Sequence, residues 1–402
     1  MRVLLITNLF PTPRDPERGV FIQQMVKRLE AYCRITVVCP LPWFPDSGPL
    51  ARVKAYREYT GIPRQYEIDG IKVYAPRYPF IPKISSSFHA RLMFTALRKT
   101  VQSLVRCTDF DLINSHWLYP DGVAAAWIAR SLGIPHIPTG RGCDVNRDIY
   151  DPRKRDQIIE TLENSSALIL VSRGLKQELE KNDIRLPSTH VIPNGVDLEK
   201  FHILPKAGCR DRLGINESFP LLLYVGRLSQ EKGIHSLIGA VAQLAASGKD
   251  FKLYLVGDGP LRAELQDLAV RHGIGERVHF VGKVDHNEVA YWMGSADFLC
   301  LPSLREGCPN VILEALGSGR PVLASEVGAI PDFVNADTGI LFTPENVESI
   351  SHALTLAGER DWDADVINRS IAGFSWEETA RRYFDVFQSC CETLPRTGAQ
   401  EK

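Results

Sequence analysis

Residues 221–233, Leu-Leu-Leu-Tyr-Val-Gly-Arg-Leu-Ser-Gln-Glu-Lys-Gly, contain the pattern from which we predict the fold class. Their uncharged beginning, 221–225, has the length and composition of a strand buried on both faces of a sheet. The strand ends at Gly226, and Arg227 and Lys232 follow it on a loop. Open α/β sheets bind ligands at the carboxyl ends of their strands. The sequence therefore predicts that these two cations lie at a ligand-binding edge of the sheet.

Similar short apolar runs alternate with longer segments of helical period along the rest of the chain. This alternation predicts a parallel sheet covered by helices on both faces, and it occurs twice. The expected strands of the first half are 3–7, 35–39, 71–75, 112–115, 136–139, 167–171 and 190–193. Those of the second half are 221–225, 252–256, 278–281, 298–301, 322–325 and 340–342.

Two domains are also expected from the length, because 402 residues exceed what one hydrophobic core normally serves. A turn signal, Asn194-Gly-Val-Asp197, separates the two series of strands, and we interpret the polar stretch after it, to about residue 216, as a linker. We predict a Rossmann-like N-terminal domain over 1–200 and a Rossmann-like C-terminal domain over 201–374. The remaining segment, 375–402, is predicted to form a helix that packs back on the N-terminal domain.

The composition excludes several classes of function. With 47 Lys and Arg against 48 Asp and Glu, the chain has no bulk attraction for nucleic acid or anionic membrane. The nine cysteines show no C-x-x-C pair or zinc-finger spacing, so we expect reduced thiols, no bound metal and a cytoplasmic location. No window approaches the roughly 18 to 20 apolar residues that span a bilayer.

One segment, residues 51–106, departs from the balanced charge with 11 Lys or Arg against 3 Asp or Glu, and aromatic residues are interleaved with its charges. A solvated face is the interpretation that we favour slightly. The alternative is a peripheral surface that contacts anionic lipid at the inner face of the plasma membrane.

Two glutamates flank the start of a predicted helix within residues 302–314, Pro-Ser-Leu-Arg-Glu-Gly-Cys-Pro-Asn-Val-Ile-Leu-Glu. Glu306 follows a strand, and Glu314 lies one turn inside the helix, whose first residue we expect to be Pro309. A helix start carries a partial charge of about +0.5, which suits a phosphate or a sugar hydroxyl. The backbone N–H groups expected to point at such a ligand belong to Gly307, Cys308 and Asn310. Two isolated surface glutamates would form no site, but the surrounding loop favours one.

Other strand ends supply further candidates. Gly257 begins a glycine turn that superficially resembles a dinucleotide fingerprint, although Arg262 stands at the position of its third glycine. Val284 follows another strand and is a candidate for backbone contact with a base. In the first half, His116 ends a strand and is aimed at the ligand side of the sheet. Gly19, before the first helix, could let a phosphate approach the backbone.

These segments together resemble the retaining glycosyltransferases of family 4, which have the GT-B architecture, an α/β fold of two facing Rossmann-like domains with parallel sheets and a cleft between them. The most specific part is the pair Glu306 and Glu314, eight positions apart. The segments 191–197 and 225–228 also match. The stretch 116–122, His-Trp-Leu-Tyr-Pro-Asp-Gly, resembles the branch that builds bacterial surface polysaccharides and exopolysaccharides, including teichuronic-acid-type assembly enzymes.

The resemblance implies a role for each matched residue. Arg227 and Lys232 would bind the donor diphosphate, and Glu306 the hydroxyls of the donor sugar. Glu314 would bind the nucleotide ribose, and His116 would face the transferred sugar. The four residues implied in catalysis are Glu306, His116, Arg227 and Lys232. Gly19 would lie near the phosphate.

The implied reaction moves a hexose-type sugar from a nucleotide diphosphate to a glycan or lipid-linked acceptor with retained anomeric configuration. No metal or other cofactor is implied, because Arg and Lys neutralise the diphosphate. The family more often has His-Gly-Ser-Asp where this chain has Arg141-Gly-Cys-Asp144, so an acceptor-side role for Asp144 is the weakest inference. A nucleotide-sugar epimerase and a non-catalytic scaffold in a glycan-assembly complex are the alternatives.

Overall fold

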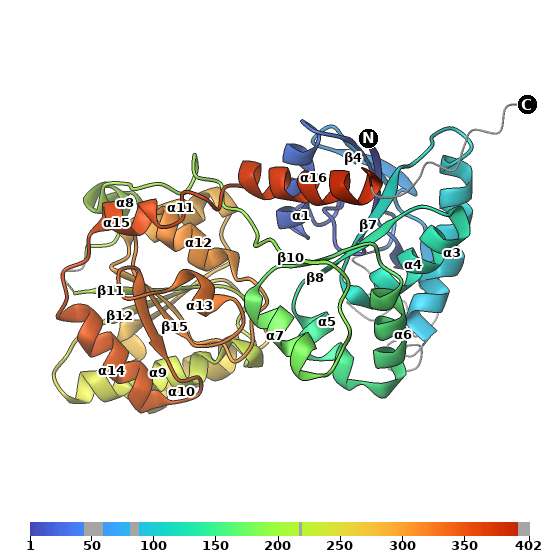
Figure 1. The fold of residues 1–402 in the computed structure, drawn as a ribbon. Coiled ribbons are helices and arrows are strands. Elements are labelled where there is room, and N and C mark those ends of the chain that lie inside the picture. The colour runs from blue at the N-terminus through green and yellow to red at the C-terminus, as the bar shows by residue number, and fades with distance from the viewer. Residues whose placement is uncertain (44–58, 81–87, 217–218, 393–402) are drawn as a thin grey trace, which may run out of the picture. The chain divides into compact units, whose positions relative to one another are not determined.

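The computed structural model describes residues 1–43, 59–80, 88–216 and 219–392. The chain divides into two compact units (Figure 1). Unit 1 comprises Met1–Pro193 and Trp376–Lys402, and unit 2 comprises Asn194–Ser375. The division precedes the expected boundary after residue 200, because Val196 donates its N–H to the Phe374 carbonyl at 2.8 Å and so joins the end of unit 2 to its beginning.

Unit 1 is built on a sheet that is parallel except for one edge strand. Its strand order is β10-β9-β8-β7-β1-β2-β5-β4, and β4 pairs antiparallel with β5. Two further short strands form a separate parallel pair, β3 with β6. The bounds are β1 Arg2–Ile6, β2 Arg34–Val38, β3 Leu41–Trp43, β4 Gln65–Ile68, β5 Ile71–Tyr74, β6 Arg77–Pro79, β7 Leu112–His116, β8 His136–Gly140, β9 Leu168–Leu170 and β10 Thr189–Val191.

Helices cover both faces of this sheet because successive residues of its central strand point to opposite sides. Val3 and Leu5 of β1 join one apolar core, whereas Leu4 and Ile6 join another. Helices α1 and α16 lie side by side over the first core, and α3 and α4 cover the second (Figure 1). The bounds are α1 Val20–Leu29, α3 His89–Leu104, α4 Val123–Leu132, α5 Cys143–Asn146, α6 Pro152–Glu163, α7 Arg173–Lys181 and α16 Trp376–Glu392.

Unit 2 has a fully parallel sheet of order β13-β12-β11-β14-β15-β16. Helices α9, α10 and α14 pack together on one face, and α8, α11, α12 and α15 cover the other (Figure 1). The strands are β11 Leu221–Val225, β12 Lys252–Val256, β13 Val278–Gly282, β14 Phe298–Leu301, β15 Val322–Ser325 and β16 Gly339–Phe342. The helices are α8 Lys206–Leu213, α9 Ile234–Ala246, α10 Arg262–Arg271, α11 His286–Ser295, α12 Asn310–Gly317, α13 Ile330–Phe333, α14 Val347–Gly358 and α15 Ala364–Arg369.

The predicted fold class is confirmed, and each expected strand is present within one or two residues of its predicted bounds. The interpretation of the stretch up to residue 216 as a linker was wrong, because α8 forms there. Its Cys209 is buried, and Lys206 and Arg210 bind the two carboxylate oxygens of Asp297 at 2.5 and 2.7 Å. These contacts fix α8 beside α11.

Strands β3, β4 and β6 were not predicted. β3 and β6 are three residues long and contain proline, and β4 is a half-exposed edge strand. In the described part of the chain no helix is both long and apolar enough to span a bilayer. Within the basic segment 51–106, residues 51–58 and 81–87 lie outside the described residues.

Candidate functional site

The loops that follow β11 and β14 meet at the carboxyl edge of the unit 2 sheet. The sheet order reverses between these two adjacent strands, and open α/β sheets bind ligands at such a switch point. The Leu304 N–H donates to the Glu231 carbonyl at 2.9 Å. A Cβ at Gly233 would lie 2.1 Å from the Pro302 carbonyl oxygen, so only glycine permits this approach. The two loops are therefore locked to each other.

The contact between the loops brings Lys232 and Glu306 together. Lys232 Nζ lies 2.6 Å from Glu306 Oε1, and Ser303 Oγ donates to the same oxygen at 2.6 Å. The Glu306 side chain is only 9% exposed, against 23% for Lys232. A Cβ at Gly328 would lie 2.1 Å from the Glu306 carbonyl oxygen, so the turn after β15 supports this loop from behind. The sequence predicted both residues here, and the structure joins them directly.

Helix α12 begins immediately after this loop. Pro309 is its N-cap rather than its first residue, with ψ of 105° outside the helical range, which corrects the predicted start by one position. Gly307 and Cys308 are half-buried, and Asn310 accepts a hydrogen bond from Asn194 at 2.7 Å through its side chain. In the described part of the chain no backbone acceptor is assigned to the N–H groups of Gly307 or Asn310. The helix start therefore retains donors for a ligand.

Glu314 lies on α12 and contacts His286, which in turn contacts Lys200; sequence reasoning missed both residues. His286 Nε2 is 3.1 Å from Glu314 Oε1, and His286 Nδ1 is 2.8 Å from Lys200 Nζ. The Glu314 side chain is 13% exposed, whereas that of His286 is 47% exposed. His286 begins α11 shortly after the end of β13, so the rule that strand ends carry ligand-binding residues could have found it.

Arg227, Gly257 and Val284 follow β11, β12 and β13, respectively, at this same edge. Arg227 is exposed and makes no ion pair among the described residues. Gly257 donates its N–H to the Gly282 carbonyl at 2.7 Å, and a Cβ on it would lie 2.0 Å from the Gly226 carbonyl oxygen. This close backbone approach explains why residue 257 is a glycine. Val284 packs half-buried against the core of unit 2.

His116 ends β7 as predicted, but its side chain is fully buried in unit 1. The Asn114 amide donates to the Ile137 carbonyl at 2.8 Å, so its Oδ1 faces His116 Nε2 at 3.1 Å and accepts that proton. Arg141 Nε donates to His116 Nδ1 at 3.0 Å. Burial, followed by the charge of Arg141, holds the pKa of His116 well below its usual range. The structure therefore makes His116 a buried, neutral group within unit 1.

Asp144 and Gly19 are also explained by the internal structure of unit 1. The Asp144 carboxylate is buried and accepts backbone N–H bonds from Leu118 at 2.8 Å, Gly142 at 2.7 Å and Arg141 at 3.1 Å. It joins the loops after β7 and β8. Gly19 is the N-cap of α1 with φ of 65°, and a Cβ on it would lie 2.6 Å from the Leu9 carbonyl oxygen. Neither residue needs a ligand to account for it.

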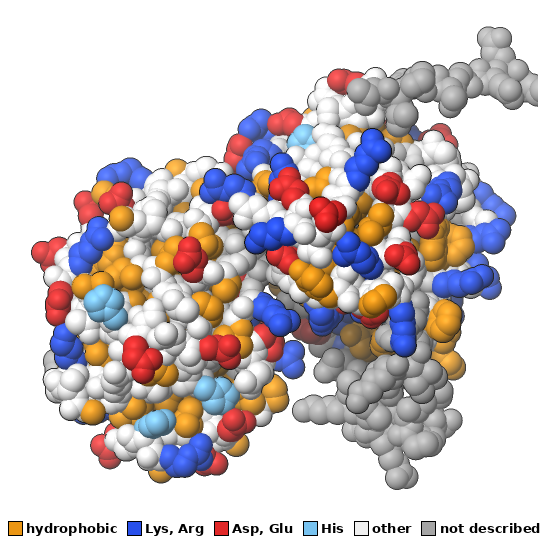
Figure 2. All heavy atoms as spheres, turned by 60° about the horizontal axis from the view of Figure 1, so that its bottom comes forward, with side chains coloured by type: hydrophobic (Ala, Val, Ile, Leu, Met, Phe, Trp, Pro, Cys, Tyr) orange, Lys and Arg blue, Asp and Glu red, His pale blue; other side chains and the backbone are white. Residues whose placement is uncertain are grey.

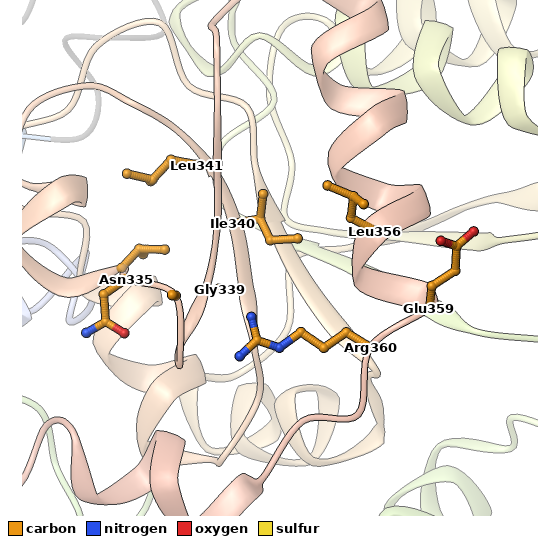
Figure 3. A pocket seen from close by; sticks show the side chains of 9 residues that line it. Asn335, Gly339, Ile340, Leu341, Leu356, Glu359 and Arg360 are labelled. Atoms are coloured by element: carbon orange, nitrogen blue, oxygen red, sulfur yellow. The ribbon is translucent and has the colours of Figure 1, made fainter.

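A hollow of about 620 Å³ lies elsewhere in unit 2, along the edge strand β16 (Figure 3). Ile340 and Leu356 form part of its apolar lining, and Arg360 extends into the same space (Figure 3). None of the predicted donor-binding residues lines it. Among the described residues, no three His, Cys, Asp or Glu side chains gather as metal ligands.

Two family models and a curated relative match this chain. Residues 19–200 match the family model described as Glycosyltransferase Family 4, and residues 219–357 match the one described as Glycosyl transferases group 1. A Bacillus subtilis glycosyltransferase, TuaC, whose name assigns it to teichuronic acid biosynthesis, is 32% identical over 374 residues, which cover 91% of this chain and 92% of TuaC.

Solved structures show the same fold at low identity. A sucrose-phosphate synthase from Thermosynechococcus elongatus has a TM-score of 0.79 at 20% identity, with 98% of this chain and 100% of that chain covered. Anabaena HepE in complex with UDP has a TM-score of 0.73 at 20% identity, with 97% of this chain and 100% of that chain covered. Both matches extend over both units.

Proposed function

This chain is a member of the GT-B glycosyltransferases that combine a family 4 domain with a group 1 domain, and on that premise we propose a specific reaction for it. It transfers a hexose-type sugar from a nucleotide diphosphate donor to a glycan or lipid-linked acceptor, with retention of the anomeric configuration. The observation that carries the proposal is the set Lys232, Glu306 and Ser303, held by two locked loops at the switch point of the unit 2 sheet.

The donor diphosphate binds to the cations of this edge. Arg227 is exposed and can turn to a phosphate, whereas Lys232 is bound to Glu306 in the structure. An ammonium has three donors, so Lys232 can keep one bond to Glu306 and give another to a phosphate oxygen. The N–H groups at the start of α12 add donors of the same polarity. Each charge-assisted bond contributes about 1.5–3 kcal/mol.

The donor sugar is held by Glu306. Its carboxylate has a fixed orientation because Lys232 and Ser303 both bind Oε1. Carboxylate oxygens accept hydrogen bonds from hydroxyl groups, so Glu306 can grip the sugar beside the diphosphate. The nucleotide ribose, which also presents hydroxyl donors, is assigned to Glu314. His286 orients that carboxylate through Oε1. Gly257 and Val284 contact the nucleotide in this proposal, through backbone atoms at neighbouring strand ends.

Transfer with retention takes place on one face of the sugar. The acceptor oxygen forms a bond to the anomeric carbon as the bond from that carbon to the phosphate oxygen breaks. The acceptor proton passes to the departing phosphate, so atoms and charge balance without a further base. Arg227 and Lys232 stabilise the negative charge that develops on the diphosphate. The proposal needs no metal or other cofactor, because these two side chains supply the positive charge.

The proposed acceptor class is supported by a relative of the chain rather than by the site. TuaC is named for teichuronic acid biosynthesis, and this chain covers 92% of it. We therefore place the reaction in the assembly of a cell-surface polysaccharide or exopolysaccharide, on the cytoplasmic side of the membrane.

The experiment is a panel of UDP-, GDP- and ADP-sugars tested by saturation-transfer NMR, followed by transfer assays with labelled donor. We expect one nucleotide sugar to bind and to release free nucleotide only when an acceptor is present. The product linkage should keep the anomeric configuration of the donor. Release of a nucleotide-bound epimer would overturn the proposal in favour of an epimerase, and binding without turnover would favour a scaffold. Full activity in EDTA is expected.

Membrane contact is a separate part of the proposal. The exposed face of α3 and the turn after it carries Arg91, Arg98, Lys99 and Arg106, and none of them makes an ion pair among the described residues. Lys and Arg side chains gather on the outer rim of unit 1 where α3 lies (Figure 2). Such a face suits anionic headgroups. We expect sedimentation with phosphatidylglycerol vesicles at low salt, and loss of binding in R91Q/R98Q; equal binding of this variant would contradict the assignment.

A further inference from the structure

Two arginines distant in sequence hold the same short segment at the carboxyl edge of the unit 1 sheet. Arg18, in the loop between β1 and α1, donates from Nη1 to Tyr59 Oη at 2.7 Å and from Nη2 to the Asn8 carbonyl at 2.7 Å. Arg77, on β6, donates from Nη2 to the Ile62 carbonyl at 2.6 Å. The segment 59–62 thus fixes both guanidinium groups on one side of unit 1.

A third arginine lies against the same segment. The Arg14 Nη2 atom is 3.2 Å from the position that a Cβ at Gly61 would occupy. Gly61 has φ of 75°, so the turn itself also requires glycine, and the exposed Arg14 side chain lies over it. Three guanidinium groups therefore gather around four consecutive residues.

Two of these groups keep buried donors that nothing in the described residues uses. Arg18 Nε and Arg77 Nη1 are shielded from solvent and have no hydrogen-bond partner. A buried N–H group without a partner costs free energy that an acceptor would recover. Guanidinium forks present such donors in pairs, which matches the oxygens of a phosphate.

The positive charge of the cluster is not neutralised by its neighbours. Arg14, Arg18 and Arg77 make no ion pair among the described residues. Burial raises the pKa of Cys39, which lies beside them, to about 12, so this thiol stays neutral. Burial also raises the pKa of Asp121 well above its usual range and favours its uncharged form. The exposed carboxylate of Asp15 also acts on the pKa of Arg18, after the larger effects of burial, Tyr59 and Cys39.

We propose that Arg14, Arg18 and Arg77 form a second anion site, in unit 1, that binds a phosphate or diphosphate group of the acceptor. Identifying the ligand as part of the acceptor rests on the proposed function, whereas the phosphate site itself does not. The oxygens of a phosphate can accept hydrogen bonds from several guanidinium groups at once. A single carboxylate on a flexible sugar has too few oxygens to bind three guanidinium groups in this way. The cluster is separate in the chain from the cations of the donor site, Arg227 and Lys232, which belong to unit 2.

The test is hydrogen–deuterium exchange of the full chain with and without inorganic pyrophosphate. We expect protection of the peptides that span 8–19 and 59–66. R77Q should weaken that protection by raising the apparent dissociation constant about tenfold or more. R14Q is the second variant, because Arg14 is exposed and its replacement does not remove a buried contact. The matched control is R185Q, at an exposed arginine elsewhere in unit 1.

The unit 2 variant K232A separates this site from the donor site. It should leave the protection of residues 59–66 unchanged even if it abolishes transfer. Vesicles of phosphatidylcholine with phosphatidic acid form a second arm. Binding to them that depends on Arg77 and on phosphatidic acid identifies a lipid headgroup as the source of the phosphate, and protection by pyrophosphate alone identifies a soluble one. Absence of both effects, or equal effects in R77Q and R185Q, overturns the proposal.

Discussion

Polar and charged side chains follow the strands at the carboxyl edges of both sheets, but their exposure to solvent differs. In unit 1, the His116, Arg141 and Asp144 side chains are at most 9% exposed and satisfy one another or nearby backbone groups. In unit 2, Lys232 and Arg227 remain open to solvent beside the nearly buried Glu306. A polar residue at a strand end can thus stabilise the loops or meet the ligand. Solvent exposure of the cations, rather than position along a strand, therefore separates the two proposed roles.

The largest effect is expected for Glu306→Gln in unit 2. The substitution keeps the shape of the side chain but removes the charge that pairs with Lys232 and that, in the proposed function, binds the sugar. We expect the rate of transfer to fall about 100- to 1000-fold, in the range for a lost electrostatic group, with little change in stability. Single-turnover assays and thermal unfolding measure both. Glu326→Gln, at an exposed glutamate just after β15, is the control. A wild-type rate in E306Q would show that Glu306, like Asp144, only stabilises the loops around it.

The opposite outcome is expected for Asp144→Ala in unit 1. Three buried backbone N–H groups lose their acceptor, at a cost of about 3 kcal/mol or more in the free energy of unfolding. Donor binding by unit 2 should persist at temperatures where unit 1 is folded. Denaturant unfolding and exchange of peptides around 118 and 141 provide the measurement. Asp156→Ala, at an exposed position in α6, should change stability by less than about 0.5 kcal/mol. Similar stability of the two variants would refute the structural role.

The dependence of stability on pH tests the internal role of His136 in unit 1. This histidine is buried on β8, and its ring binds Ser115 Oγ at 2.9 Å. Burial lowers the pKa of His136 to about 3, whereas an unfolded histidine titrates near about 6.5. The unfolded state therefore takes up a proton first, and stability falls as the pH drops below about 6.5.

Relative to His136→Gln, we expect the wild type to lose about 2 kcal/mol of stability between pH 7 and pH 5. Asp121 and Asp144 have pKa values that burial raises, so they act in the opposite direction. They are present in both proteins, and their effect cancels in the difference. His272→Gln, at an exposed histidine in unit 2, serves as the control. Parallel pH profiles of the wild type and H136Q would show that His136 is not held neutral.

The smallest effect is expected for Arg227→Gln. Arg227 is exposed, so stability should not change, but one charge-assisted bond to the donor is lost. The KM for the donor should rise about tenfold, more strongly at low salt than at high salt. Steady-state kinetics at two ionic strengths measure this, with Arg271→Gln at an exposed arginine of α10 as the control. An unchanged KM would remove Arg227 from the donor site.

Much of the fold could be predicted because its signals are local. Buried parallel strands are continuous apolar runs, and each run that we predicted as a strand became one. The strands that were missed lack this signal: β4, Gln65–Ile68, alternates between exposed and buried residues, and β3 and β6 contain proline. Helix α8 was missed because its stability comes from Asp297, 87 residues beyond Arg210 in the sequence.

The candidate site was predictable only in part. Strand-end position located Lys232 and Glu306 correctly on the same edge, but the 2.6 Å ion pair between them was not foreseen. The same rule led to His116, whose ring is enclosed by groups from β7 and β8. It could have led to His286, which was overlooked although it follows β13.

The two series of strands, the residues at their carboxyl ends and the family could all be predicted from the sequence, because they depend on short-range pattern and chemical type. Only the tertiary structure decided which of those residues reach solvent. Burial and hydrogen-bond saturation arise from neighbours that are distant in the chain, as Arg141 is from His116 and Glu306 is from Lys232. Those long-range contacts decide whether a charge is satisfied internally or left to bind a ligand.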